Sequence, residues 1–260
     1  MTLFRSSAMA LAIALAGAPA IAPTAAQAQI AVGVSVGFAP PPLPVYAQPV
    51  WPGAGYVWTP GYWAWSAHYY DYFWTPGTWV LAPVGLYWTP PWWGWSNGAY
   101  LFHAGYWGHE VGYYGGIAYG FGYDGVGYLG GYWRGRQFQY NTVVNNLGGA
   151  RVANSFARPV GAVRASAASF NGPGGASLRP TAQQLAAANG RHVQATAMQV
   201  RNLNAAAARP ALRASFNHGA PQLAATSRPG RFSGAGVTAA ARRRGAHERT
   251  AGPIEPAGAQ

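Results

Sequence analysis

One aromatic phrase around a Pro-Gly pair recurs in the first half of this chain and limits how it can fold. The chain reads YVWTPGYW at residues 56–63 and YFWTPGTW at 72–79, followed by an altered copy, LYWTPPWW, at 86–93. A fourth and weaker copy starts at Tyr100, so that successive copies begin 16, 14 and 14 residues apart. A unit this short cannot bury an aromatic face alone, and neighbouring copies must therefore pack on one another.

Within each copy, large apolar residues alternate on both sides of the Pro-Gly pair. In the first copy, Tyr56 and Trp58 precede the pair, and Trp63 and Trp65 follow it. A period of two with aromatic enrichment predicts strands. Proline removes a ladder donor and glycine permits a kink, so each copy is predicted to form two short strands or one bent strand. Turn-forming residues join the copies, which predicts a meander of hairpins and a mainly β fold.

A Gly-rich stretch, YGGIAYGFGYDGVGYLGGYW, follows at residues 114–133. Its Asp124-Gly125 pair is typical of a two-residue hairpin turn. This turn would pair Phe121 with Tyr128 on one face and leave Gly122 on the open face for close approach of another segment.

The aromatic residues are numerous enough that most of them must form the core. Between Trp51 and Trp133 there are 12 Trp and 14 Tyr residues. Burying about 200 Å² of each ring at ~25 cal/mol/Å² yields at most ~130 kcal/mol. Ordering the 83 residues of this stretch costs ~125 kcal/mol, at about 1.5 kcal/mol per residue. Only a minority of the rings can therefore remain exposed for a ligand.

Charge divides the chain into two unlike halves. The stretch 29–133 carries three carboxylates and no basic residue, whereas 134–260 carries 16 Arg and two Glu, a formal charge of +14. Ala, Arg, Gly, Ser and Pro dominate after Asn145, and this composition predicts disorder. Two capping boxes, Thr181-x-x-Gln184 and Thr196-x-x-Gln199, predict short helices near residues 181–189 and 196–208.

The first residues have the layout of a secretory signal peptide. Arg5 precedes an apolar run from Ala8 to Ala22, and Ala26-Gln27-Ala28 forms a small-x-small cleavage site, so we expect export and removal of this segment. The alternative, a retained anchor, is disfavoured because a run of about 15 residues is short of the ~20 that span a bilayer. We expect no transmembrane span after removal of the signal. The chain has no Cys, which excludes disulfides and thiolate metal sites.

These patterns predict a mainly β protein in four parts. We expect an aromatic β-hairpin repeat module followed by a low-complexity, largely disordered tail with two short helices. The parts are a signal peptide (1–28), a Pro-rich linker (29–54), an aromatic and Gly-rich β-repeat module (55–145) and an Arg/Ala-rich tail (146–260).

The repeats resemble a known group of exported bacterial proteins. Trp58 to Trp63 and Trp74 to Trp79 each fit W-x-x-G-x-W, and together with the Gly-rich stretch they look like the WXXGXW or YXWGXW repeat family. The third copy departs from the motif with Pro91 in place of Gly, and the fourth with Phe102 in place of Trp. The resemblance covers roughly residues 55–141 and implies export and a repeat architecture. It implies no catalytic residues.

The basic half suggests anionic partners. Its only run of charge is Arg242-Arg243-Arg244, a candidate contact for polyanions. For an exported protein we expect anionic envelope polymers or lipid rather than nucleic acid as partners. The alternative is a solvated tail without a dedicated partner.

We therefore expect an exported, non-enzymatic structural or interaction protein of the cell envelope, in the periplasm or outside the cell. The alternative is a glycan-binding module, in which three or more coplanar exposed rings would lie beside polar side chains. The candidate glycan contacts are Trp65, Asp71, Trp95, Asn97, Glu110 and Asp124.

An enzyme of unknown type ranks third. Gly94-Trp95-Ser96-Asn97-Gly98 matches the nucleophile-elbow motif, but that motif requires a following helix, whereas a strand pattern follows here. The His, Asp and Glu residues fit no ligand spacing, so we expect no metal and no cofactor.

Overall fold

The mainly β prediction is confirmed in the computed structural model, which describes residues 33–161 and 167–241. Each copy of the repeat forms two short strands separated at its Pro-Gly, Pro-Pro or Ala-Gly pair, as the alternation predicted. The eight repeat strands are β2 (Tyr56–Thr59), β3 (Tyr62–Ser66), β4 (Asp71–Thr75), β5 (Gly77–Leu81), β6 (Tyr87–Thr89), β7 (Trp92–Ser96), β8 (Ala99–His103) and β9 (Tyr106–Gly108).

The four copies pair two by two into two bent hairpins. In the first hairpin, β3 pairs with β4 and β2 pairs with β5, in one register that runs through the bend. In the second hairpin, β7 pairs with β8 and β6 pairs with β9, again in one register. The kinks therefore face each other, and a proline that removes a ladder hydrogen bond lies where the partner strand also bends.

This pairing makes the motif complementary to its own second copy. Trp58 lies opposite Trp79 and Trp63 opposite Trp74, and each pair of rings is in edge contact at 5.3 Å between centroids. The glycine makes these contacts fit: a Cβ built on Gly61 would lie 2.3 Å from a ring carbon of Trp74. The reciprocal contact is present in the partner copy, where a Cβ built on Gly77 would lie 2.7 Å from a ring carbon of Trp58. Each glycine therefore makes room for the first tryptophan of the other copy.

The two departures from the motif fall on a single contact of the second hairpin. Gly105 lies against Trp88, and its Cβ would be 2.6 Å from the ring, as in the first hairpin. By register, Pro91 and Phe102 occupy the positions that Gly61 and Trp74 hold there. A phenyl ring is smaller than an indole, so the residue in the place of Gly61 has no need to be glycine. The two substitutions thus compensate each other sterically.

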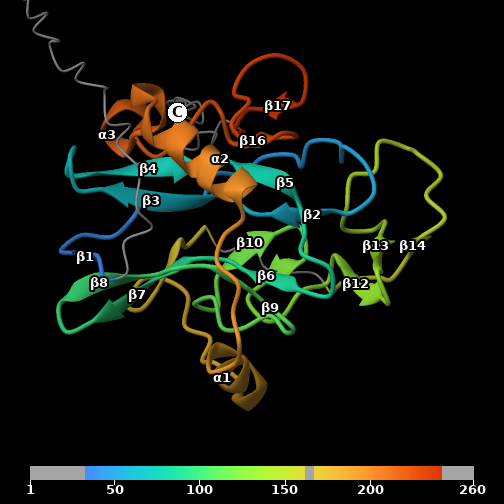
Figure 1. Cartoon of the computed structure of the whole chain (residues 1–260). Coiled ribbons are helices and arrows are strands. Elements are labelled where there is room, and N and C mark those ends of the chain that lie inside the picture. The colour runs from blue at the N-terminus through green and yellow to red at the C-terminus, as the bar shows by residue number, and fades with distance from the viewer. Residues whose placement is uncertain (1–32, 162–166, 242–260) are drawn as a thin grey trace, which may run out of the picture.

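The two hairpins stack as layers around a tryptophan core. The β3–β4 pair lies over the β7–β8 pair, with α2 and α3 on the outer side of β4 (Figure 1). The Trp93 indole N–H donates to the Trp63 carbonyl at 2.8 Å, and the Tyr72 ring meets Trp93 at 5.1 Å. As expected, most indoles belong to the core. Seven of the 12 Trp residues are buried: Trp58, Trp63, Trp74, Trp79, Trp88, Trp93 and Trp107.

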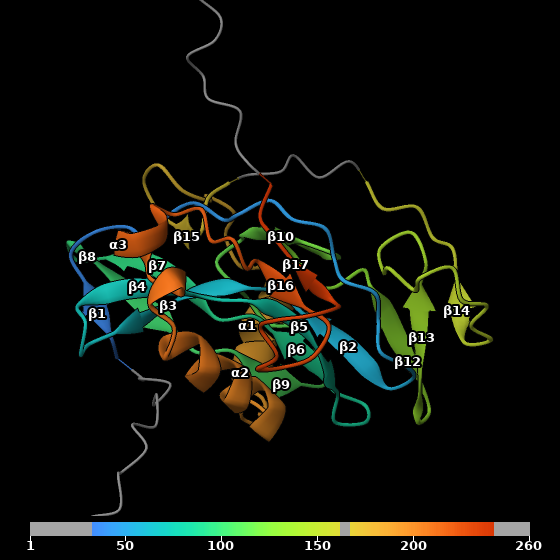
Figure 2. The ribbon, with the colours of Figure 1, turned by 90° about the horizontal axis from the view of Figure 1, so that it is seen from above.

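The remaining elements are short and surround these layers, with β12–β14 at the end of the molecule far from β1 (Figure 2). The further strands are β1 (Ser35–Val36), β10 (Ala118–Gly120), β11 (Tyr123–Asp124), β12 (Gly131–Arg134), β13 (Gln137–Asn141), β14 (Ser155–Phe156), β15 (Phe170–Asn171), β16 (Ala225–Thr226) and β17 (Val237–Thr238). The helices are α1 (Ala182–Ala188), α2 (Ala197–Ala207) and α3 (Ala214–Asn217), with a 3₁₀ turn at Pro210–Leu212.

Both predicted helices are present and begin at their predicted caps. The Thr181 and Thr196 side chains accept from the backbone N–H groups of Gln184 and Gln199, which complete the capping boxes. None of the helices within residues 33–161 and 167–241 is long and apolar enough to cross a membrane.

Residues 146–161 and 167–241 differ from the predicted tail because they complete the sheets of the repeat module. Two-residue strands from this half join it in parallel: β14 pairs with β13, β15 with β7 and β16 with β5. Helix α2 packs on β4 and buries Leu203 and Ala206. The composition change at residue 145 is therefore not a boundary of the fold.

The Pro-rich residues 33–54 are likewise part of the fold rather than a free linker. Strand β1 pairs with β8. Farther along, the carbonyls of Pro42 and Pro49 accept the indole N–H groups of Trp63 and Trp79 at 3.2 and 2.9 Å. Proline offers an acceptor without a donor, which suits a segment laid against indoles that only donate.

The predicted hairpin turn at Asp124-Gly125 is wrong. Strand β10 pairs with β11 through Ala118↔Asp124 and Gly120↔Tyr123, so the chain turns at Phe121-Gly122. Both turn residues have positive φ, +52° and +88°. Phe121 does not pair with Tyr128; its ring packs instead on Tyr46 and Trp58 at 5.2 and 5.5 Å. This anchoring outweighs the local preference of Asp-Gly, and Gly122 is needed because its Cβ would lie 2.6 Å from the Gly130 nitrogen.

Two predictions lie outside the described residues. These are the signal peptide at residues 1–28 and the candidate polyanion contacts Arg242, Arg243 and Arg244.

The contact between Gly61 and Trp74 predicts non-additive substitutions. Gly61→Ala is expected to lower the free energy of unfolding by about 1–3 kcal/mol because its methyl group collides with the indole. Trp74→Phe is also destabilising, since it loses a hydrogen bond, but the double variant should be less destabilised than the sum by ~1 kcal/mol. Urea denaturation of the four proteins measures this coupling. Gly37→Ala, at a site with open space, should change stability by less than about 0.5 kcal/mol; additive effects would contradict the contact.

The docking of β16 on β5 predicts slow amide exchange in a segment that lies far along the chain from the repeats. The N–H of Ala224 donates to Thr238 and that of Ser227 to Gly236, both at 2.8 Å. We expect both amides to be protected to a degree comparable with strand β5, because β16 opens only with the sheet that it joins. Hydrogen–deuterium exchange measures this. Exchange at the rate of an unstructured peptide would contradict the described packing.

Candidate binding surface at the tip of the first hairpin

The turn that joins β3 to β4 exposes an aromatic ring on a constrained backbone. Residues 67–70 form this turn, since Ser66 pairs with Asp71. Tyr70 has φ +51° and its side chain is 75% exposed. A left-handed conformation is unfavourable for a bulky residue that is not glycine, and such residues are often found at functional sites.

Other aromatic rings lie around Tyr70, most of them exposed and Trp65 only partly exposed. Trp65 lies 5.2 Å from the Tyr70 ring and 5.7 Å from Phe38, which is itself half exposed. The Tyr72 hydroxyl donates to the Phe38 carbonyl at 2.8 Å and so fixes this neighbour in place. We call the group of Phe38, Trp65, Tyr69, Tyr70 and Phe216 the aromatic tip.

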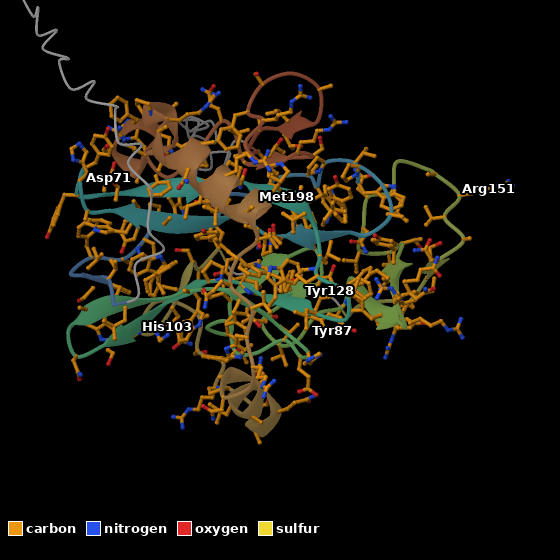
Figure 3. All side chains as sticks on the ribbon, in the orientation of Figure 1. Asp71, Tyr87, His103, Tyr128, Arg151 and Met198 are labelled. Carbon is orange, nitrogen blue, oxygen red and sulfur yellow. The ribbon has the colours of Figure 1, made fainter. Side chains whose placement is uncertain are left out.

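Helix α3 supplies the polar side of the aromatic tip. The Arg213 guanidinium lies over the Tyr69 ring at 3.2 Å and 5.9 Å from the Phe216 ring. Asp71, at the start of β4 (Figure 3), accepts hydrogen bonds from the Ser215 N–H and hydroxyl at 3.2 and 2.6 Å. The tip thus combines exposed rings with a cation and a carboxylate that are held in position by neighbouring groups.

Of the predicted glycan contacts, Trp65 belongs to the aromatic tip and Asp71 borders it, and the others lie elsewhere. Trp95 is 40% exposed at the end of β7 and packs on Tyr100, with ring centroids 4.7 Å apart. The exposed Asn97 occupies the two-residue β7–β8 turn with φ +49°. Glu110 is exposed and accepts from Gln183 at 3.2 Å.

Asp124 borders a separate cavity. The cavity, of about 300 Å³, is lined mainly by apolar residues of the Pro-rich segment and the β10–β11 hairpin, among them Leu43, Tyr46 and Phe121. Partial burial desolvates the carboxylate and raises the pKa of Asp124. The six predicted contacts therefore do not form one site.

Ring orientation argues against a flat platform in the aromatic tip. Trp65 meets Phe38 at 69° and Tyr70 at 74°, so these rings are edge-to-face rather than coplanar. The tip can present single ring faces, which suits a compact ligand rather than a long flat one. Among residues 33–161 and 167–241, no three His, Asp or Glu side chains gather closely enough to hold a metal ion.

Sequence reasoning missed most of the aromatic tip. It assigned aromatic residues to the core by their alternation, and Tyr69 and Tyr70 stand outside that alternation, in a turn. The sequence did hold one signal for this surface, namely the two adjacent rings of Tyr69 and Tyr70 in a turn. Arg213 and Phe216 carried no signal, because only the fold brings them to the turn.

The motif around Ser96 is a hairpin turn, as predicted. Asn97 and Gly98 form the turn with positive φ, and strand β8 follows directly. A nucleophile elbow requires a helix at this point.

No protein-family model, curated protein or solved structure matches this chain.

Asp124 predicts a pH-dependent effect on stability. Its pKa is raised in the folded protein, so the folded state binds the proton more tightly than the unfolded state does. The protonated Asp124 side chain therefore stabilises the folded state. This stabilisation is complete below the ordinary Asp pKa of about 3.9 and is lost as pH rises through the pKa of Asp124 in the folded protein. Asp124→Asn should therefore raise the Tm at neutral pH, and the gain should vanish below about pH 4.

Thermal unfolding at the two pH values, followed by near-ultraviolet circular dichroism, measures this gain. Glu110→Gln removes one negative charge at an exposed position and serves as the control for net charge. A lower Tm of Asp124→Asn at neutral pH would contradict the desolvation argument.

Proposed function

We propose that this chain is an exported, non-enzymatic interaction protein of the bacterial cell envelope and that the aromatic tip is its contact surface. The resemblance of its repeats to the WXXGXW family and the secretory layout of residues 1–28 support export to the periplasm or the cell exterior. The buried repeat tryptophans act as the scaffold, and the exposed rings lie at its end.

The observation that carries this proposal is Tyr70. A ring that is 75% exposed on a left-handed backbone gains little from the core and imposes a conformational cost. Its neighbours are ordered by contacts of their own, so the surface is preorganised before any partner arrives.

Glycan binding is the alternative function. The rings of the aromatic tip are not coplanar, contrary to what we expected of a glycan-binding module, but its combination of rings and charged groups suits a small sugar. Aromatic faces bind the apolar side of a sugar, while charged side chains bind its hydroxyl groups. Asp71 has one carboxylate oxygen engaged by Ser215. The Arg213 backbone pairs with Phe73, two residues from Asp71, and its guanidinium lies over the Tyr69 ring. The edge-to-face rings favour one or two sugar units over a long flat chain.

Sedimentation with isolated cell-wall and outer-membrane fractions tests the proposed surface. Tyr70→Ala is expected to weaken the affinity about five- to thirtyfold, since an exposed aromatic anchor typically contributes about 1–2 kcal/mol. Tyr132→Ala is the matched control, because Tyr132 is an exposed ring at the other end of the fold, on β12, and its removal should leave binding unchanged.

Competition identifies the partner class in the same assay. Soluble oligomers of N-acetylglucosamine should displace the protein from the wall fraction if the partner is glycan. Binding that survives Tyr70→Ala unchanged would contradict the aromatic tip as the contact surface, whichever fraction retains the protein.

A further inference from the structure

A second and separate pocket lies under the β16–β17 turn. It has a volume of about 420 Å³ and is lined by Arg228 and Arg231 together with the hydroxyl-bearing residues Thr226, Ser227 and Thr238. Pro49 and Val50 of the Pro-rich segment close one side, and Ala235 and Gly236 complete the lining. This pocket shares no residue with the aromatic tip.

The loop that carries both arginines is held by one buried side chain. Thr226 is 1% exposed, and its hydroxyl oxygen lies 2.7 Å from the Arg231 carbonyl and 3.2 Å from the Arg228 carbonyl. The same oxygen accepts from the Arg228 N–H at 3.3 Å. Ser227 donates its N–H to Gly236 at 2.8 Å and closes the loop at its base. The backbones of both arginines are therefore fixed, and only their side chains need ordering when a ligand binds.

The pocket has positive charge and no carboxylate to neutralise it. None of its lining residues is acidic. Residues 33–161 and 167–241 contain 11 Arg and only three acidic residues, and those three lie elsewhere: Asp71 at Ser215, Glu110 at Gln183 and Asp124 in its own cavity. Because the Thr226 hydroxyl is engaged by the loop carbonyls, the hydroxyl groups left to donate to a ligand are those of Ser227 and Thr238. Two arginines beside these hydroxyl groups form a surface suited to an anion.

We propose that this pocket binds a phosphate-type oxyanion group. A tetrahedral oxyanion offers oxygens in several directions and can accept from two guanidinium forks and from hydroxyl groups at once, whereas a planar carboxylate fills one fork. The site goes beyond the proposed contact at the aromatic tip and does not depend on it. The same headgroup chemistry occurs in free phosphate and in anionic phospholipids, so the test separates these two sources.

The experiment titrates inorganic phosphate into the purified full chain at constant ionic strength and follows the amide NMR signals of residues 226–236. We expect saturable shifts confined to this loop. Arg228→Gln/Arg231→Gln should weaken binding at least about tenfold, because both charge-assisted contacts are lost. In a second arm, the same proteins are sedimented with vesicles of phosphatidylcholine, with or without phosphatidylglycerol.

Two matched variants separate a specific site from general charge. Arg134→Gln/Arg136→Gln removes the same charge at the exposed β12–β13 turn and should bind phosphate as the unmodified chain does. Arg228→Lys/Arg231→Lys keeps the charge but loses the planar fork, and we expect a loss of about threefold or more. Near-ultraviolet circular dichroism confirms that each variant folds.

Each outcome decides the proposal. Phosphate binding that is lost only in the Arg228/Arg231 variants supports the site, and vesicle binding with the same dependence assigns the group to a lipid headgroup. Vesicle binding that is insensitive to these variants, together with phosphate binding that depends on them, assigns the group to a non-lipid phosphate. Equal losses in the Arg134/Arg136 control, full affinity in the lysine variant, or no binding in either arm would overturn the proposal.

Discussion

The fold depends on hydrogen-bond acceptors for its buried indole N–H groups. An indole can donate but cannot accept, so its burial costs free energy unless an acceptor reaches it. Five buried indoles have such an acceptor, those of Trp63, Trp74, Trp79, Trp93 and Trp107, whereas the buried Trp58 N–H has none among the described residues. In this protein many of these acceptors come from outside the repeat strands that carry the rings. They are the carbonyls of Pro42, Pro49 and Ala224 and the side chain of Gln199. The tryptophan core therefore draws the Pro-rich segment and the Arg-rich half of the chain onto the repeat module.

Local patterns in the sequence predict what is locally determined. The alternation around Pro-Gly predicts the paired short strands, and the Thr-x-x-Gln boxes predict where α1 and α2 begin. Docking of residues 167–241 could not be predicted in the same way, because the groups that attach Ala224 and its neighbours are backbone atoms, which every residue has. The turn at Phe121-Gly122 was not predicted for a related reason, because Phe121 is held by Tyr46, which belongs to a segment distant along the chain.

The candidate binding surface likewise has one part that local sequence indicates and another that only distant contacts create. Trp65 and Asp71 could be named from their residue types, but nothing local shows that Ser215 and Arg213 reach the same turn. The repeats also explain their own irregularities once the register is known. Pro91 and Phe102 read as separate deviations along the chain, yet by register they hold the places of Gly61 and Trp74, which contact each other in the first hairpin. In this chain the motif therefore acts as a pair of interlocking copies rather than as a single string of residues.

The hydrogen bond from Trp74 to Ala224 joins residues 150 positions apart, and this distance has a consequence for when the chain can fold. A ribosome that has released only the repeats has released indoles whose acceptors have not yet been made. Closing loops of this length is slow, and the two-residue strands β14, β15 and β16 offer little local structure to speed it. The hydrogen bonds of Trp74 and Trp107 can therefore form only after residues 224 and 199, respectively, have been synthesised.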